Sequence, residues 1–251
     1  MFAPSTIFKS NSVTIVGNIS TTTGSGNYKY VIKTLDSANL IISGNLTAGG
    51  ASSFQIPLLH WSTGNVKISG SVAAGAASND HGIWINTSGS LDVTGNVTGY
   101  NLSYAINNTS LGIIRIIGTV NKPISTNGSS TVYNASAGTI IVTGSVLGGD
   151  ANYNGKWGIY NAGSGNVYIS GSVFAGQGGS QANGVVNASI GLVEIIGTVV
   201  GGVPGGSGAL VSMAGATNTS TGTKIIRGPV SASIIAPGVS STCTDRKSTR
   251  L

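Results

Sequence analysis

The residues of this chain that could do acid–base chemistry are few and widely spaced. Outside the last seven residues, the carboxylates are Asp36, Asp80, Asp92, Asp150 and Glu194. Cleavage of a glycosidic bond needs two carboxyl groups about 5–9.5 Å apart. In the repeat described below, Asp92 and Glu194 fall about 19 Å apart, and Asp80 and Asp150 about 14 Å apart. We therefore expect no hydrolase or lyase activity within this chain.

The two histidines and the single cysteine add no catalytic set. His60 follows Leu58-Leu59 at a turn, where we expect a structural role. His81 could act as a general base, but only Asp80 lies beside it in the sequence. Cys243 has no second cysteine with which to form a disulfide or a metal-binding pair. The sequence thus predicts no catalytic residues, no cofactor and no metal site.

A short phrase recurs about every 26 residues from Val13 to Val230. Its fifth residue is glycine, which is followed by a polar and an aliphatic residue, as in Val66-Lys67-Ile68-Ser69-Gly70-Ser71-Val72. Side chains alternate along a strand, so Val66, Ile68 and Val72 are predicted to face inward, with Gly70 at a corner. A repeat of this length indicates units that bury their apolar faces only by stacking.

Another short strand precedes each phrase, for example Gly158-Ile159-Tyr160-Asn161. The sequence therefore predicts an all-β parallel β-helix, or β-solenoid, with three short strands per coil and about nine coils. We expect a single solenoid domain over 12–235, an N-terminal segment over 1–11 and a C-terminal segment over 236–244.

The preceding strands end in asparagine, and these residues are expected to form one column of stacked amides. The predicted members are Asn86, Asn107, Asn134, Asn161 and Asn187. Asparagine amides can hydrogen-bond along a stack, which favours a structural ladder over a row of ligand-binding amides. His60 and Lys33 take this position in earlier coils, and Ser212 takes it in a later one.

The last seven residues, 245–251, resemble the translation of a sequencing adapter and are set aside as an artefact. They hold three of the twelve basic residues and one of the six acidic ones, so without them the net charge falls from +6 to +4. The remaining bases are scattered and do not alternate with aromatic residues. This distribution does not suit nucleic-acid binding. The sequence contains no apolar stretch of about 18 residues, so it predicts no transmembrane segment.

The repeats resemble the parallel β-helices of bacterial filamentous-haemagglutinin and autotransporter-type adhesins, and the shafts of phage tail fibres and tailspikes. The likeness covers about Ser12 to Ile235 and rests on the repeat pattern alone. It implies an extracellular, cell-surface or virion rod, either monomeric or homotrimeric. The alternative that it implies is a polysaccharide-degrading tailspike or pectate-lyase-like enzyme whose active site lies largely outside this chain.

Loops that follow the third inward column vary in length and are the expected place for specificity. Their aromatic and amide residues suit the faces and hydroxyls of sugars, and the alternative is that the rings shelter the flank of the rod. The candidate glycan contacts are Tyr100, Asn101, Tyr104, Tyr153, Asn154 and Trp157. We therefore expect a structural or adhesive rod that contacts cell-surface polysaccharide.

Overall fold

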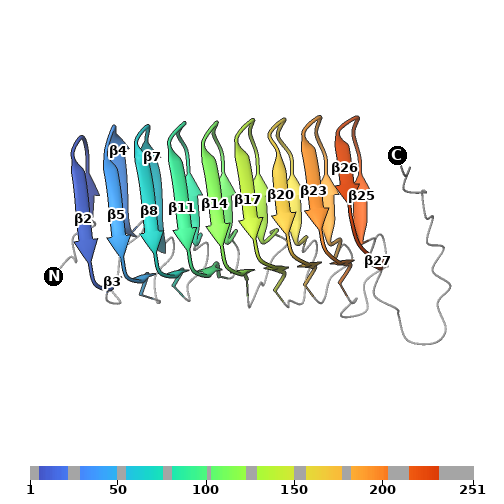
Figure 1. Cartoon of the computed structure of the whole chain (residues 1–251), viewed down its shortest axis with the longest axis horizontal. Coiled ribbons are helices and arrows are strands. Elements are labelled where there is room, and N and C mark those ends of the chain that lie inside the picture. Colours follow the sequence, from blue (N-terminus) through green and yellow to red (C-terminus); the bar gives the residue numbers. More distant parts are fainter. Residues whose placement is uncertain are drawn as a thin grey trace.

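The chain forms a parallel β-solenoid in which successive coils lie side by side along one axis (Figure 1). This computed structural model describes residues 6–21, 29–49, 55–75, 81–100, 103–122, 129–149, 157–176, 182–202 and 215–231. Within these ranges every regular element is a β-strand, and each coil contributes one strand to each of three sheets. The predicted fold class, the three strands per coil and the repeat of about 26 residues are confirmed.

All three sheets contain nine strands that pair in parallel with the strands of neighbouring coils. Sheet 1 is made of β1 (Thr6–Phe8), β4 (Lys29–Asp36), β7 (Gln55–Ser62), β10 (Ile83–Ile85), β13 (Ile106–Asn108), β16 (Val132–Asn134), β19 (Ile159–Asn161), β22 (Val185–Asn187) and β25 (Ala216–Asn218). Sheet 2 is made of β2 (Ser12–Val16), β5 (Asn39–Ser43), β8 (Asn65–Ser69), β11 (Ser90–Thr94), β14 (Ile113–Ile117), β17 (Thr139–Thr143), β20 (Val167–Ser170), β23 (Leu192–Ile196) and β26 (Thr223–Ile226). Sheet 3 is made of β3 (Ile19–Ser20), β6 (Leu46–Thr47), β9 (Val72–Ala73), β12 (Val97–Thr98), β15 (Val120–Asn121), β18 (Val146–Leu147), β21 (Val173–Phe174), β24 (Val199–Val200) and β27 (Val230–Ser231).

Sheet 1 begins before the predicted start of the solenoid. Thr6 of β1 pairs with Ile32 of β4, so part of the segment over 1–11 already belongs to the sheet. The residues over 236–251, which include the adapter-like tail, lie outside the described part of the chain.

The core contains the three predicted columns of aliphatic side chains and a further aliphatic column from sheet 1, which includes Leu58, Ile83 and Ile106. In the coil of β8 and β9, Val66, Ile68 and Val72 are all fully buried, and their register neighbours Leu91, Val93 and Val97 are buried in the same way. Burying one such side chain contributes about 1.5–3 kcal/mol. Lys224 of β26 ends the first column, directly beside Val193, and its side chain is half-buried. Desolvation lowers the pKa of this ammonium.

Glycine is required at the corner between sheets 2 and 3. Gly118 has a φ of 153°, and a Cβ added there would lie 2.3 Å from the carbonyl oxygen of Gly95 in the preceding coil. The polar residue after each glycine has a role that the sequence did not reveal. Asn45 Oδ1 accepts the backbone N–H of Ser71 at 2.8 Å, and Asn96 Oδ1 accepts that of Thr119 at 2.9 Å.

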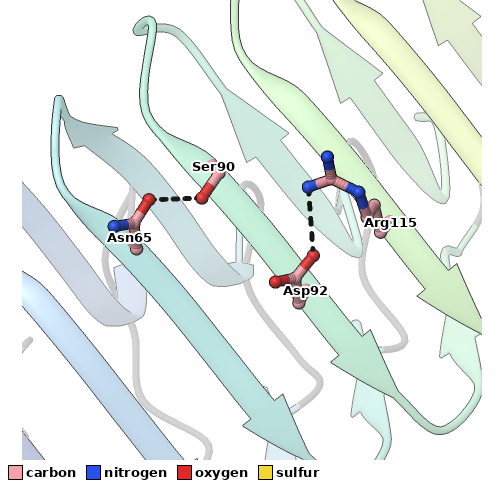
Figure 2. Close-up of polar contacts among 4 residues, drawn as sticks. All are labelled: Asn65, Ser90, Asp92 and Arg115. Carbon is pink, nitrogen blue, oxygen red and sulfur yellow. Dashed lines mark hydrogen bonds and ion pairs between the residues drawn. The ribbon is translucent and has the colours of Figure 1, made fainter.

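The outer face of sheet 2 is exposed and carries pairs of polar side chains across neighbouring strands (Figure 2). Arg115 of β14 forms an ion pair with Asp92 of β11, with 3.5 Å between Nη1 and Oδ1. Ser90 of β11 donates its hydroxyl to Asn65 of β8. Both side chains of the ion pair are about half exposed, so this face contributes to register more than to stability.

Candidate functional site

The inner face of sheet 1 carries a ladder of four buried asparagines, one from each of β13, β16, β19 and β22. Asn108 Nδ2 donates to Asn134 Oδ1 at 3.0 Å, Asn134 Nδ2 to Asn161 Oδ1 at 2.9 Å, and Asn161 Nδ2 to Asn187 Oδ1 at 3.0 Å. All four side chains are fully buried. In the last three, Nδ2 also donates to the carbonyl oxygen of the glycine four residues later. Both amide protons are thus used, which makes this column a structural ladder.

Two predicted members of the ladder, Asn86 and Asn107, were wrong, because each lies one residue away from the column. Asn108, and not Asn107, is the register neighbour of Asn134, at an ordinary step of 26 residues. The preceding coil is shorter, because Ile83 pairs with Ile106 at a step of 23 residues. In that coil, Ile85 occupies the column, while Asn86 lies outside it and is exposed. The reliable signal is an asparagine four residues before a glycine, since that spacing lets its amide reach the glycine carbonyl.

The same column continues with other residues toward both ends of the rod. Thr34 and His60 precede Ile85 in register, so Thr34 replaces the predicted Lys33. Asn218 follows Asn187 in register, whereas the predicted Ser212 lies outside the described residues. His60 is fully buried, and its Nδ1 lies 2.6 Å from Thr34 Oγ1. Burial lowers the pKa of His60 to about 4, against backbone hydrogen bonds to Gly64 and Ser90 that raise it. The predicted structural role of His60 agrees with this placement.

The outer face of sheet 1 carries a row of stacked rings, which we call the aromatic row. Its members are His81, Trp84, Tyr104, Tyr133, Tyr160 and Trp157. The centroids of Tyr104 and Tyr133 are 4.5 Å apart, and those of Tyr133 and Tyr160 are 5.6 Å apart, with interplanar angles of 17° and 22°. The row follows the axis of the rod, because its rings come from neighbouring coils, and Tyr133 and Tyr160 are register partners in β16 and β19.

Burial within the row changes the acid–base properties of its members. The pKa of His81 is lowered to about 4, mainly by desolvation and also by the positive charge of Lys122. A backbone hydrogen bond with Tyr104 opposes this lowering. Desolvation also raises the pKa of Tyr104 and of Tyr133. At neutral pH the row therefore presents neutral rings and phenolic hydroxyls.

The aromatic row ends beside a shallow, open hollow with a volume of about 280 Å³. Its lining residues are Trp157, Tyr160, Asn183, Val186, Ala188, Thr217 and Thr219. Val186 is the register neighbour of Tyr160, and Thr217 is the register neighbour of Val186. The hollow thus occupies the two strands in which the ring column is continued by smaller side chains.

The structure brings only part of the predicted glycan-contact set together. Tyr104 and Trp157 both belong to the aromatic row. Tyr100 is partly buried, and its carbonyl oxygen accepts the N–H of Ser103 at 3.5 Å. Asn101, Tyr153 and Asn154 lie outside the described residues.

Sequence reasoning missed Trp84, Tyr133 and Tyr160 as parts of the same surface. A signal was present, because the residue before each of Asn134 and Asn161 is a tyrosine, and neighbours on a strand point to opposite faces. Trp84 holds the register position of Tyr133, two coils earlier. Its indole Nε1 donates to Thr109 Oγ1 at 3.0 Å.

The described carboxylates remain isolated from one another. Asp92 and Glu194 share the outer column of sheet 2 through a register of four strand steps, about 19 Å. Each carboxylate pairs with an arginine, Asp92 with Arg115 and Glu194 with Arg227. Within the described residues, no three His, Cys, Asp or Glu side chains gather as a metal-binding group.

The described ranges include no helix with the length and apolarity to cross a lipid bilayer. The chain matches no protein-family model, no curated protein and no solved structure.

Proposed function

We propose that this chain is an extracellular adhesive rod that contacts cell-surface polysaccharide through the outer face of sheet 1. The observation that carries the proposal is the aromatic row, which spans consecutive coils along the axis of the solenoid. A linear glycan lying along the rod meets rings and hydroxyls at a spacing of about 4.8 Å per coil. The repeat architecture, which resembles those of surface adhesins and phage fibre shafts, supports the same function.

The outer faces of sheet 1 and sheet 2 differ in the side chains that they offer to a sugar. The outer face of sheet 2 carries ion pairs and scattered aliphatic residues, including Ile41, which is 47% exposed. Sheet 1 instead concentrates aromatic rings with the hydroxyls of Tyr104, Tyr133 and Tyr160. Sugar rings present apolar C–H faces and polar hydroxyls together, and mixed aromatic and hydroxyl surfaces complement both.

The test compares binding of the fluorescently labelled chain to an array of bacterial and host polysaccharides. The test variant is Tyr133→Leu combined with Trp157→Leu, which keeps apolar cover and removes the ring and indole groups. The matched control is Tyr168→Leu, which removes a tyrosine from the outer column of sheet 2. Circular dichroism checks that both variants keep their strands.

We expect the wild-type chain and the control to bind the same polysaccharides, and the double variant to lose at least about tenfold in affinity, or about 1.4 kcal/mol. Absence of binding to any polysaccharide overturns the proposal. So does equal binding by the double variant, because the contact would then lie on another surface.

A further inference from the structure

We propose that the hollow at the end of the aromatic row is a subsite for a single neutral pyranose ring, stacked on Tyr160. This inference rests on the proposed function and names the class of sugar and the place where it binds. Tyr133 stacks on Tyr160 from one side at 5.6 Å. On the other side, the register places Val186 where the next ring of the row would stand. A sugar ring in this position continues the stack with a ring that the chain does not supply.

The packing of the row explains why the subsite lies at its end. Rings within the row cover one another's faces, as the 17° and 22° interplanar angles show. The C–H face of a sugar packs favourably on the electron-rich face of an aromatic ring and gains little from contact with the ring edge. Tyr160 and the tilted Trp157, 4.4 Å away, line the hollow directly.

The polar atoms around the hollow suit sugar hydroxyls. Within the described residues, Trp157 Nε1 and Thr217 Oγ1 are both buried and make no hydrogen bond. The indole N–H can only donate, whereas the threonine hydroxyl can donate and accept. Such buried groups cost free energy when they stay unpaired. A sugar hydroxyl reaches these two shielded atoms only when the side chains of Trp157 and Thr217 turn toward it, whereas Asn183 and Thr219 line the same space.

The charge and the size of the hollow define the ligand class. Among the described residues that line it, none is acidic or basic at neutral pH, which favours a neutral sugar over a uronic or sialic acid. Sites for drug-sized ligands measure about 300–1,000 Å³. A volume of about 280 Å³ suits one sugar ring, with the rest of the glycan outside.

Saturation-transfer-difference NMR on the full chain tests the subsite with methyl glycosides of glucose, galactose, mannose and N-acetylglucosamine, and with glucuronic and sialic acids as charged probes. The key variant is Val186→Tyr, which fills the hollow with a fourth tyrosine in the stack. Its matched control is Ile141→Tyr, which adds a tyrosine beside Tyr168 on the outer face of sheet 2. Thr217→Val removes one hydroxyl while keeping the shape of the side chain.

We expect at least one neutral glycoside to bind with a Kd on the order of 1 mM, with stronger saturation transfer than either acid. Val186→Tyr should abolish this signal, Thr217→Val should weaken it several-fold, and Ile141→Tyr should leave it unchanged. The subsite is overturned if no neutral glycoside binds, if the acids bind better, or if Val186→Tyr binds as well as wild type. If Val186→Tyr still binds polysaccharide on the array like wild type, the subsite fails while the proposed function stands.

Discussion

Two ladders run along the opposite faces of sheet 1, built from residues that are neighbours in sequence. Asn134 and Asn161 belong to the inner ladder, and Tyr133 and Tyr160 belong to the outer aromatic row. Asn134 and Asn161 each donate one amide proton to the next asparagine and one to a glycine carbonyl. The outer row ends at a hollow where two polar atoms are unpaired within the described residues.

This difference separates the residues that hold the register from those available to a ligand. A buried amide that loses its partner leaves a desolvated polar group behind, whereas a lost ring contact on the surface is partly replaced by water. We therefore expect substitutions in the inner ladder to affect stability and those in the outer row to affect binding.

Asn134→Ala should have the largest effect on stability. It removes the acceptor of Asn108 Nδ2, the donor to Asn161 Oδ1 and the donor to the Gly138 carbonyl. We expect the free energy of unfolding to fall by about 4 kcal/mol, because three hydrogen bonds are lost and buried groups stay unpaired. Urea unfolding followed by circular dichroism measures it.

The control for this prediction is Asn107→Ala, on the outer face of the same sheet. The side-chain oxygen of Asn107 has no hydrogen-bond partner within the described residues. A loss as large as that of Asn134→Ala would contradict the register in which Asn108, and not Asn107, belongs to the ladder.

Acidification should destabilise the rod between pH 6.5 and pH 4 through His60 of the inner column. Its pKa falls from an ordinary value of 6.5 in the unfolded chain to about 4 in the fold. In that window the unfolded chain binds more protons, so stability is complete above pH 6.5 and is lost as the pH falls. The loss due to His60 approaches about 3 kcal/mol at pH 4, at about 1.4 kcal/mol per pKa unit.

Unfolding experiments across this pH range separate the contribution of His60 to stability from that of His81. His60→Asn removes the inner contribution, and His81→Phe, which keeps a ring in the row, removes the outer one. Each variant should show a shallower dependence on pH than the wild type. An unchanged slope in His60→Asn would mean that His60 is not the group that titrates.

Tyr133→Ala should have a moderate effect on stability. The ring stacks on Tyr104 and on Tyr160, and each such contact contributes about 0.5–1.5 kcal/mol. We expect a loss of about 2 kcal/mol in urea unfolding, roughly half of that for Asn134→Ala. A loss equal to that of the neighbouring asparagine would remove the distinction between the two ladders.

Asp92→Asn should have the smallest effect. The carboxylate is half exposed and pairs with Arg115 at 3.5 Å, and such surface pairs contribute less than about 0.5–1 kcal/mol. We expect a change within about 0.5 kcal/mol at low salt that disappears in 0.5 M NaCl. A larger change that resists salt would show that sheet 2 also depends on specific polar contacts.

The inward columns could be predicted from the sequence because burial imposes a strict alternation. Val66, Ile68 and Val72 are aliphatic in a fixed relation to Gly70, and a shift by one residue would turn them to the solvent. The corner glycine was predictable for a similar reason, since a Cβ at that position meets the backbone of the previous coil.

The ladders were less predictable because the length of the coil varies. The 23-residue step between Ile83 and Ile106 places Ile85, and not Asn86, in the column. Asn107 lies one residue before the true member, Asn108. Counting four residues back from the following glycine would have corrected both positions. The aromatic row was harder to predict because it combines two register columns. Tyr104 and Trp157 lie just before their strands, whereas Tyr133 and Tyr160 lie within them. Only the three-dimensional packing brings these rings together.

The lysine at the end of the first core column also bears on polymerisation. Among the described strands, β25, β26 and β27 each pair with a neighbour on one side only, and an exposed strand edge of this kind is a surface that can pair with another chain. A second rod that docks end to end on β26 must cover Lys224 and desolvate its ammonium within an aliphatic column. We expect Lys224→Val to remove this desolvation cost at the last described coil.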